Sequence, residues 1–110
     1  MTLYERYDAA LDARAAVLRE EAAAAKAQGD QRAQSVALMK ASMLGEMLKT
    51  LGRVEHDRRP GLLESLAAQA RGRAQALRSR DDFDAAERED IKADTILWAL
   101  ETLRKLVDEA

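Results

Sequence analysis

The sequence contains no cysteine, which excludes disulfide bonds, thiolate metal sites and thiol catalysis. No apolar run approaches the roughly 18 residues that a membrane-spanning helix requires. The N-terminal stretch MTLYERYDAALDAR carries acidic residues early and lacks the apolar core of a secretory signal. These absences favour a cytoplasmic protein without a membrane segment, and we predict that location.

Motifs for the common catalytic and cofactor sites are also missing. The chain has no phosphate-binding P-loop, no dinucleotide glycine fingerprint, no serine-nucleophile motif and no aromatic-basic alternation for single-stranded nucleic acid. His56 is the only histidine, whereas a ferritin-like metal bundle needs Glu-x-x-His pairs on two helices. We therefore expect no catalytic residues, no cofactor and no metal ion, and we predict that the protein is not an enzyme.

One acidic helix face supports a competing hypothesis. Glu87, Asp90 and Asp94 fall at positions i, i+3 and i+7, so a helix brings them to one side. Several all-helical pyrophosphatases hold Mg²⁺ with such pairs on neighbouring helices, and Glu5-x-x-Asp8 would supply a second pair if the two helices adjoined. A Mg²⁺-dependent all-α hydrolase therefore stays an alternative. We favour a solvated face, because these carboxylates lie mostly off the apolar stripe of their helix.

The formal net charge of −2 hides an uneven distribution along the chain. Residues 1–52 are balanced, residues 53–80 carry seven arginines against three acids, and residues 81–110 carry ten acids against four bases. We interpret the charges as solvated helix faces with internal pairing, and the alternative is a basic docking patch. The candidate residues of that patch are Arg71, Arg73 and Arg78. Because the ten acids follow directly, we expect no specific binding of nucleic acid.

Composition and spacing predict an all-α protein. Ala, Leu, Glu, Arg and Lys dominate, and apolar residues recur every three or four positions. Thr2 is a predicted N-cap, with Glu5 three residues later in a capping-box position. Gly29 is expected to end the first helix, and Asp30 to cap the second. The predicted helices cover about 3–27, 31–55, 61–79 and 83–108.

The predicted helix over residues 31–55 is apolar over a broad face, and we expect it to be central and heavily buried. Gly45 and Gly52 lie inside it, and each costs about 1 kcal/mol relative to Ala. They favour close helix packing or, at Gly52, an early helix end. Its methionines, which include Met43 and Met47, could instead extend the apolar core into a partner subunit.

The segment Arg58-Arg59-Pro60-Gly61 breaks the helical pattern. A proline disfavours helical geometry at the residue before it, here Arg59, and suits the first turn of a helix. We therefore expect the third helix to begin at about Gly61.

The two halves of the chain resemble each other. Shifted by 52 positions, residues 11–58 align with residues 63–110 with thirteen identities in forty-eight positions, six of them alanine. The expected cap residues Asp30 and Asp82 are among the identities. We interpret the match as a duplicated helical hairpin, and a coincidence between two alanine-rich hairpins is the alternative.

Two such hairpins predict an all-α four-helix bundle in a single domain, 1–110, with hairpin units at about 2–56 and 60–109. A superhelical stack is the other arrangement, but it needs three or more repeats. The second helix has more apolar surface than the three alanine-rich stripes can cover, which indicates a homodimer. We expect a non-catalytic helical interaction or structural module that self-associates or binds an unknown protein partner. The candidate partner-binding residues are Met43, Met47 and Trp98, with Arg71, Arg73 and Arg78.

Three segments give the sequence a resemblance to a known family. The opening MTLYERYDAALDA, the GDQRAQS turn and the later RDDFDAAERED resemble the YqeY family. These small helical proteins are related to the tail of GatB, the amidotransferase subunit that handles misacylated tRNA. The matching residues are Leu3, Glu5 and Arg6, then Asp30, Arg32 and Ser35, and then Arg80, Asp82, Phe83 and Glu87. The resemblance implies, as an alternative function, an accessory protein of tRNA-linked amidotransfer that is not itself catalytic.

Overall fold

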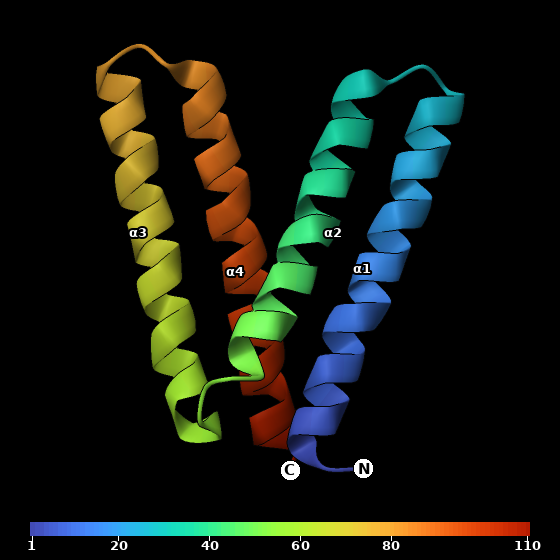
Figure 1. The fold of residues 1–110 in the computed structure, drawn as a ribbon, viewed down its shortest axis with the longest axis vertical. Coiled ribbons are helices and arrows are strands. Elements are labelled where there is room, and N and C mark those ends of the chain that lie inside the picture. The colour runs from blue at the N-terminus through green and yellow to red at the C-terminus, as the bar shows by residue number, and fades with distance from the viewer. The chain divides into compact units, whose positions relative to one another are not determined.

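The computed structural model describes all 110 residues, which form four α-helices, one short 3₁₀ helix and no strand (Figure 1). The first hairpin, Met1–Val54, contains α1 (Leu3–Ala27) and α2 (Gln31–Leu51). The second hairpin, Glu55–Glu109, contains η1 (His56–Arg58), α3 (Arg59–Ser79) and α4 (Phe83–Glu109). The predicted all-α fold class, with four helices in two antiparallel hairpins, is confirmed. That the whole chain makes a single domain stays a prediction.

Helix α1 begins and ends where local chemistry predicts. The Thr2 hydroxyl accepts a hydrogen bond from the Glu5 N–H at 3.2 Å, which satisfies a donor of the first turn. At the other end Gly29 has a φ of 74°, a left-handed conformation that glycine adopts without a Cβ clash. The Asp30 N–H then bonds the Ala25 carbonyl at 2.9 Å, and the Gly29 N–H bonds the Lys26 carbonyl at 3.1 Å. This is the Schellman closure of a helix.

Helix α2 ends at Leu51, so the prediction that it extends to Glu55 is wrong. Gly52 is its C-cap, and the Gly52 N–H bonds the Leu48 carbonyl at 3.0 Å. The next two N–H groups, of Arg53 and Val54, bond carbonyls only three residues back. The chain therefore tightens into a 3₁₀-type turn and leaves the helix. The early end suggested by Gly52 is the correct interpretation.

Helix α3 starts at Arg59, two residues before the predicted start. Arg59 has φ −58° and ψ −46°, so it is helical although a following proline disfavours that geometry, and the expected start at about Gly61 is wrong. Two facts explain the difference. The preceding turn η1 already coils the chain, and the first N–H groups of a helix have no intrahelical partner, so Pro60 removes no hydrogen bond.

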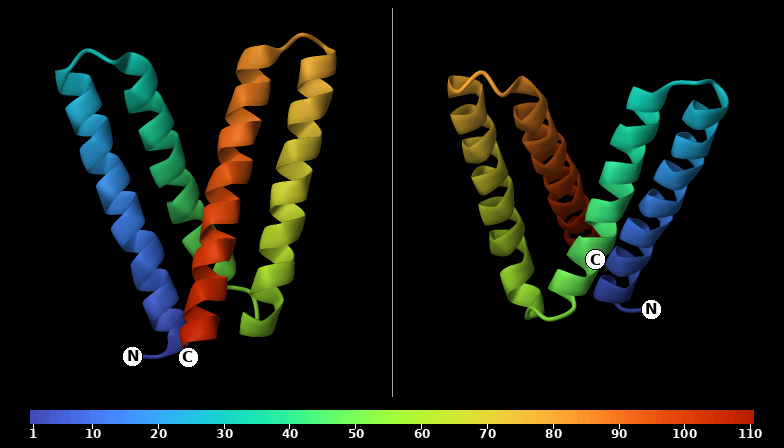
Figure 2. Two further views of the ribbon diagram at one scale, coloured as in Figure 1. Left: turned by 180° about the vertical axis from the view of Figure 1, so that it is seen from behind. Right: turned by 45° about the horizontal axis from the view of Figure 1, so that its top comes forward.

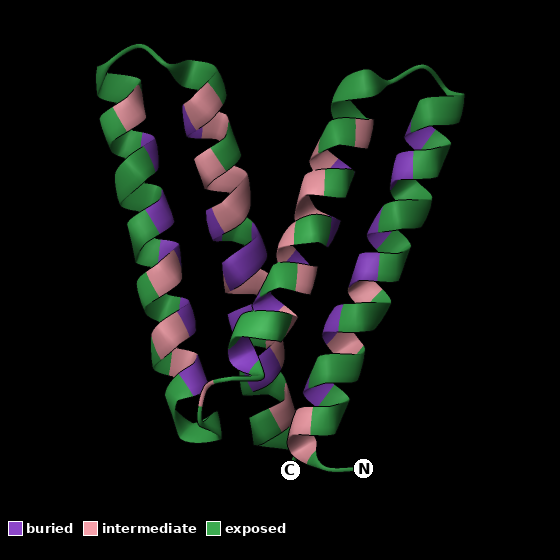
Figure 3. Cartoon of the chain, in the orientation of Figure 1, coloured by how far each residue is buried: buried purple, intermediate pink, exposed green.

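Each hairpin is held together by a stripe of buried side chains along each helix (Figure 3). Many of the residues in these stripes are alanines, so the two helices of a hairpin can lie close together, as they do in both views of Figure 2. The buried residues of the first hairpin are Tyr7, Leu11, Ala15, Leu18, Ala22, Ala25, Ala37, Ala41, Leu44, Met47 and Leu51. Those of the second are Arg59, Leu63, Ala67, Ala70, Ala74, Ala86, Ala93, Thr95, Ile96, Ala99, Leu100 and Leu103.

The buried faces of α1 and α3 correspond under the shift of 52. The first five buried positions of α1, from Tyr7 to Ala22, have buried counterparts in α3, from Arg59 to Ala74. Arg59 takes the place of Tyr7 and is only 3% exposed. An arginine can fill such a place because its aliphatic stem packs like an apolar side chain. The geometry thus agrees with the duplicated hairpin inferred from the alignment.

The two connecting turns also match. Asp81, the counterpart of Gly29, has a φ of 61° and is the only non-glycine residue with a positive φ. The Asp82 N–H bonds the Leu77 carbonyl at 2.9 Å, and the Asp81 N–H bonds the Arg78 carbonyl at 3.0 Å. Both hydrogen bonds are the 52-residue equivalents of those that close α1. One turn is therefore used twice, with glycine in the first copy and aspartate in the second.

Candidate functional site

The arginines proposed as a docking patch lie on α3, and two of them are paired within their own hairpin. The Arg73 Nε lies 3.1 Å from the Glu89 Oε2, and the Lys92 Nζ lies 3.3 Å from the Glu89 Oε1. Arg78 pairs with Asp90 in the same way across the two helices. The interpretation as internal charge pairing is confirmed for these residues, whereas Arg71 is exposed.

The acidic face of α4 is partly used by the same pairing. Glu87 and Asp90 are half-buried, Asp94 is exposed, and Asp90 contacts Arg78. No group of three or more histidine, aspartate or glutamate side chains lies close enough together to hold a metal ion. His56 is exposed in η1.

The methionines and the tryptophan proposed for partner binding differ in exposure. Met47 is 5% exposed and forms part of the buried interior. Met43 and Trp98 are half-buried. Near these methionines, a Cβ added to Gly45 would meet no atom within 4 Å, so the close packing expected there is wrong.

Helix α2 is less covered than the sequence suggested. The helix was expected to be central and heavily buried, but Leu38 is 46% exposed and Val36 is half-buried. Leu38 is therefore an apolar side chain of α2 that keeps much of its contact with solvent.

Helix α4 has different residue types at the positions equivalent to this part of α2. Under the shift of 52, the run Val36-Ala37-Leu38 aligns in sequence with Arg88-Glu89-Asp90. Three successive charged residues of the second hairpin are thus apolar in the first. The alignment of the two halves contains this contrast, but the partner-binding residues predicted from the sequence do not include Val36 or Leu38.

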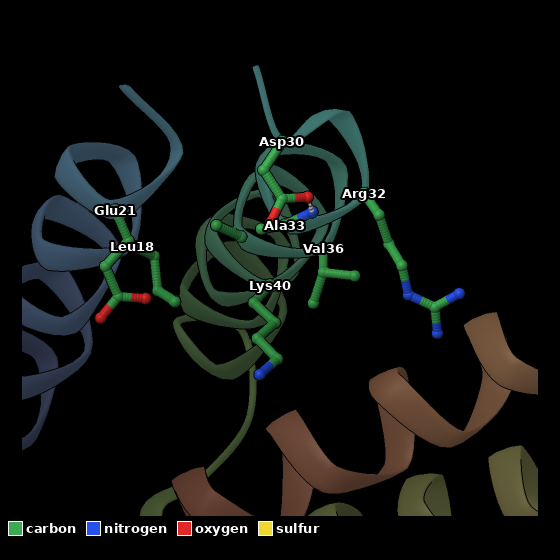
Figure 4. A pocket seen from close by; sticks show the side chains of 8 residues that line it. Leu18, Glu21, Asp30, Arg32, Ala33, Val36 and Lys40 are labelled. Atoms are coloured by element: carbon green, nitrogen blue, oxygen red, sulfur yellow. Dashed lines mark hydrogen bonds between the residues drawn. The ribbon is translucent and has the colours of Figure 1, made fainter. Parts of the chain in front are cut away.

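A surface hollow of about 320 Å³ lies beside this apolar run (Figure 4). Leu18 and Glu21 come from α1, and the other lining residues come from the first three turns of α2 and its cap. Leu18 and Ala37 are buried beneath it, and charged side chains of both signs stand around it. The complete lining is Leu18, Glu21, Asp30, Arg32, Ala33, Val36, Ala37 and Lys40.

The second hairpin uses the equivalent surface differently. The counterparts of Glu21, Ala37 and Lys40 are Arg73, Glu89 and Lys92, the three residues of the ion-paired cluster. The side chain of Glu89 is only 14% exposed there. A charged cluster therefore occupies in one hairpin the place of an apolar-floored hollow in the other.

No helix is long and apolar enough to span a bilayer. Comparisons with protein-family models, with curated proteins and with solved structures gave no match.

Proposed function

We propose that the protein is a non-catalytic helical interaction module of the cytoplasm that self-associates as a homodimer through the first hairpin. The proposal is carried by one observation, the apolar run Val36-Ala37-Leu38 where the matched hairpin has Arg88-Glu89-Asp90. The proposed contact surface is the solvent-exposed part of α2 around Leu38 and Val36.

Comparison with the second hairpin shows which apolar residues of α2 are not required for the hairpin to fold. Helix α4 forms with three charged residues at these positions, so the hairpin fold does not require apolar side chains there. Leu38 is exposed, although its counterpart Asp90 shows that a charged residue is compatible with this helix position. Contact of the leucine side chain with water does not stabilise the hairpin. Apolar residues at a solvated surface contribute free energy when a second surface covers them.

Light scattering or sedimentation at micromolar concentration tests the proposal. The wild-type protein is expected at twice the mass of one chain. The double variant Val36→Arg, Leu38→Asp copies the residues of α4 and is expected to be monomeric with unchanged helical circular dichroism. The control is Gln75→Ala, which changes an exposed side chain on α3 and should leave the dimer intact. A monomeric wild-type protein at these concentrations would remove the proposal.

A further inference from the structure

The hollow on the first hairpin lies where the second hairpin has an ion-paired carboxylate. The Glu89 carboxylate lies 3.1 Å from Arg73 of α3 and 3.3 Å from Lys92 of α4, and the Glu89 side chain is only 14% exposed. The equivalent residue of the first hairpin is Ala37, whose methyl group cannot fill that space. The hollow of about 320 Å³ beside Ala37 therefore includes the place that an acidic side chain takes in the matched hairpin.

The two charged residues that flank this place have opposite signs. Lys40 is the equivalent of Lys92 but has no ion-pair partner, since the acid that would supply one is absent from its helix. On α1, Glu21 takes the place of Arg73, so an acid replaces a base. The Glu21 carboxylate lies 3.9 Å from Arg14 of its own helix. A ligand in the hollow thus meets an ammonium group from α2 and a carboxylate from α1 (Figure 4).

The other two charged residues of the lining are used within the chain. The Asp30 carboxylate accepts the Ala33 N–H at 3.0 Å, and Arg32 also has an interaction within the chain. Beneath the charges lie the buried apolar residues Leu18 and Ala37. The hollow therefore combines an apolar floor with one further charge of each sign.

A molecule that carries both charges and an apolar chain matches these features. Ligand pockets in proteins start at about 300 Å³ and combine an apolar lining with a few polar groups, so this hollow suits a small ligand. A ligand of one charge sign would be attracted by Lys40 or Glu21 and repelled by the other. We propose that the hollow binds a small zwitterion of the amino-acid class with an apolar side chain. Its carboxylate contacts Lys40, its ammonium group contacts Glu21, and its hydrocarbon chain lies over Leu18.

This site is separate from the surface proposed for self-association. The hollow lies between α1 and α2 of one hairpin, and Leu38 is not part of its lining. Val36 belongs to both surfaces, so a dimer could cover the hollow. The variant Leu38→Asp removes the exposed leucine of the dimer surface and keeps every residue of the hollow. The inference does not rest on self-association, and this variant keeps the two tests apart.

An NMR titration of the ¹⁵N-labelled full chain with L-leucine tests the proposal. It is performed on the wild type and on Leu38→Asp, up to the solubility limit of leucine. Saturable shifts are expected in the amide signals of Glu21, Ala37 and Lys40. Two analogues of leucine serve as probes of charge, 4-methylpentanoate without the ammonium group and isopentylamine without the carboxylate. Each should bind at least about tenfold more weakly, because it loses a charge-assisted hydrogen bond.

Three variants test the residues of the site. Lys40→Gln should weaken leucine binding at least about tenfold. The double variant Glu21→Arg, Ala37→Glu copies the charged cluster of the second hairpin and should abolish binding with unchanged helical circular dichroism. Lys49→Gln changes an exposed lysine of the same helix outside the hollow and should bind leucine as the wild type does. Absence of saturable shifts in both titrated proteins, equal binding of either analogue, or unchanged binding by Lys40→Gln would overturn the proposal.

Discussion

Asp30 and Asp82 lie 52 positions apart and make the same hydrogen bond. The Oδ1 of Asp30 accepts the Ala33 N–H at 3.0 Å, and the Oδ1 of Asp82 accepts the Ala85 N–H at 3.3 Å. Each carboxylate also stands at the positive end of the helix that it caps. The two hairpins thus begin their second helices with one chemical device.

Replacing either cap should lower stability by a similar amount. We expect Asp30→Ala and Asp82→Ala each to cost about 0.5–2 kcal/mol in the free energy of unfolding, because each leaves a first-turn N–H without its acceptor. The costs should be nearly additive in the double variant, since each cap serves its own helix. Urea denaturation measures all three. Asparagine should restore most of the loss because it caps without charge. A neutral Asp30→Ala would contradict the shared role.

The left-handed turn position should respond in opposite directions in the two hairpins. Asp81 holds a φ of 61°, which strains a side chain with a Cβ, whereas Gly29 holds a φ of 74° without strain. Relief of roughly 1–2 kcal/mol in Asp81→Gly should exceed the added chain entropy of about 0.5–1 kcal/mol, so this variant should be more stable. Gly29→Ala should be less stable by about 1 kcal/mol. Thermal and chemical denaturation should agree on both signs, and destabilisation by Asp81→Gly would refute the argument.

Gly45 and Gly72 should be improvable helix positions. A Cβ at either position would meet no atom within 4 Å, and both lie well inside a helix. Each change to alanine should raise the free energy of unfolding by about 1 kcal/mol, because alanine loses less backbone entropy on folding. Gly52 is the control, since a Cβ there would lie 3.3 Å from the Leu48 carbonyl oxygen. A loss of stability in Gly45→Ala, measured under monomeric conditions, would show that the position needs glycine.

Binding of tRNA should be weak and should fall steeply with salt. Arg73 and Arg78 are paired with acids of α4, so they are poorly placed to neutralise phosphates. A fluorescence anisotropy titration with tRNA at physiological salt measures the affinity. Submicromolar binding that disappears when Arg71, Arg73 and Arg78 become alanine would favour the amidotransferase-linked alternative over self-association.

Sequence reasoning succeeded where the cause is local. The caps at Thr2, Asp30 and Asp82 and the turn at Gly29 depend on neighbours within a few residues, and all four lie as predicted. The buried stripe of α1 follows from the same short-range spacing. These features need no knowledge of what packs against the helix.

Sequence reasoning failed where competing local effects or tertiary packing determine the conformation or burial of a residue. At Arg59 the coil of η1 outweighs the effect of the following proline. Nothing in the spacing distinguishes the buried Met47 from the half-buried Met43, because their difference depends on how the helix is rotated against its neighbours. The hollow lies between two helices and cannot be read from one of them. Its apolar wall at Val36 was visible only as a difference between the two halves.

The short turns have a consequence for how the chain reaches this structure. Helix α1 packs on α2, and α3 on α4, and in each pair only three residues separate the helices. Contacts between near neighbours in the chain form without closing large loops, and proteins rich in them fold within microseconds to milliseconds. During synthesis, the first hairpin can close before the residues of the second have left the ribosome. The duplicated turn thus lets each hairpin form from contacts within its own half of the chain.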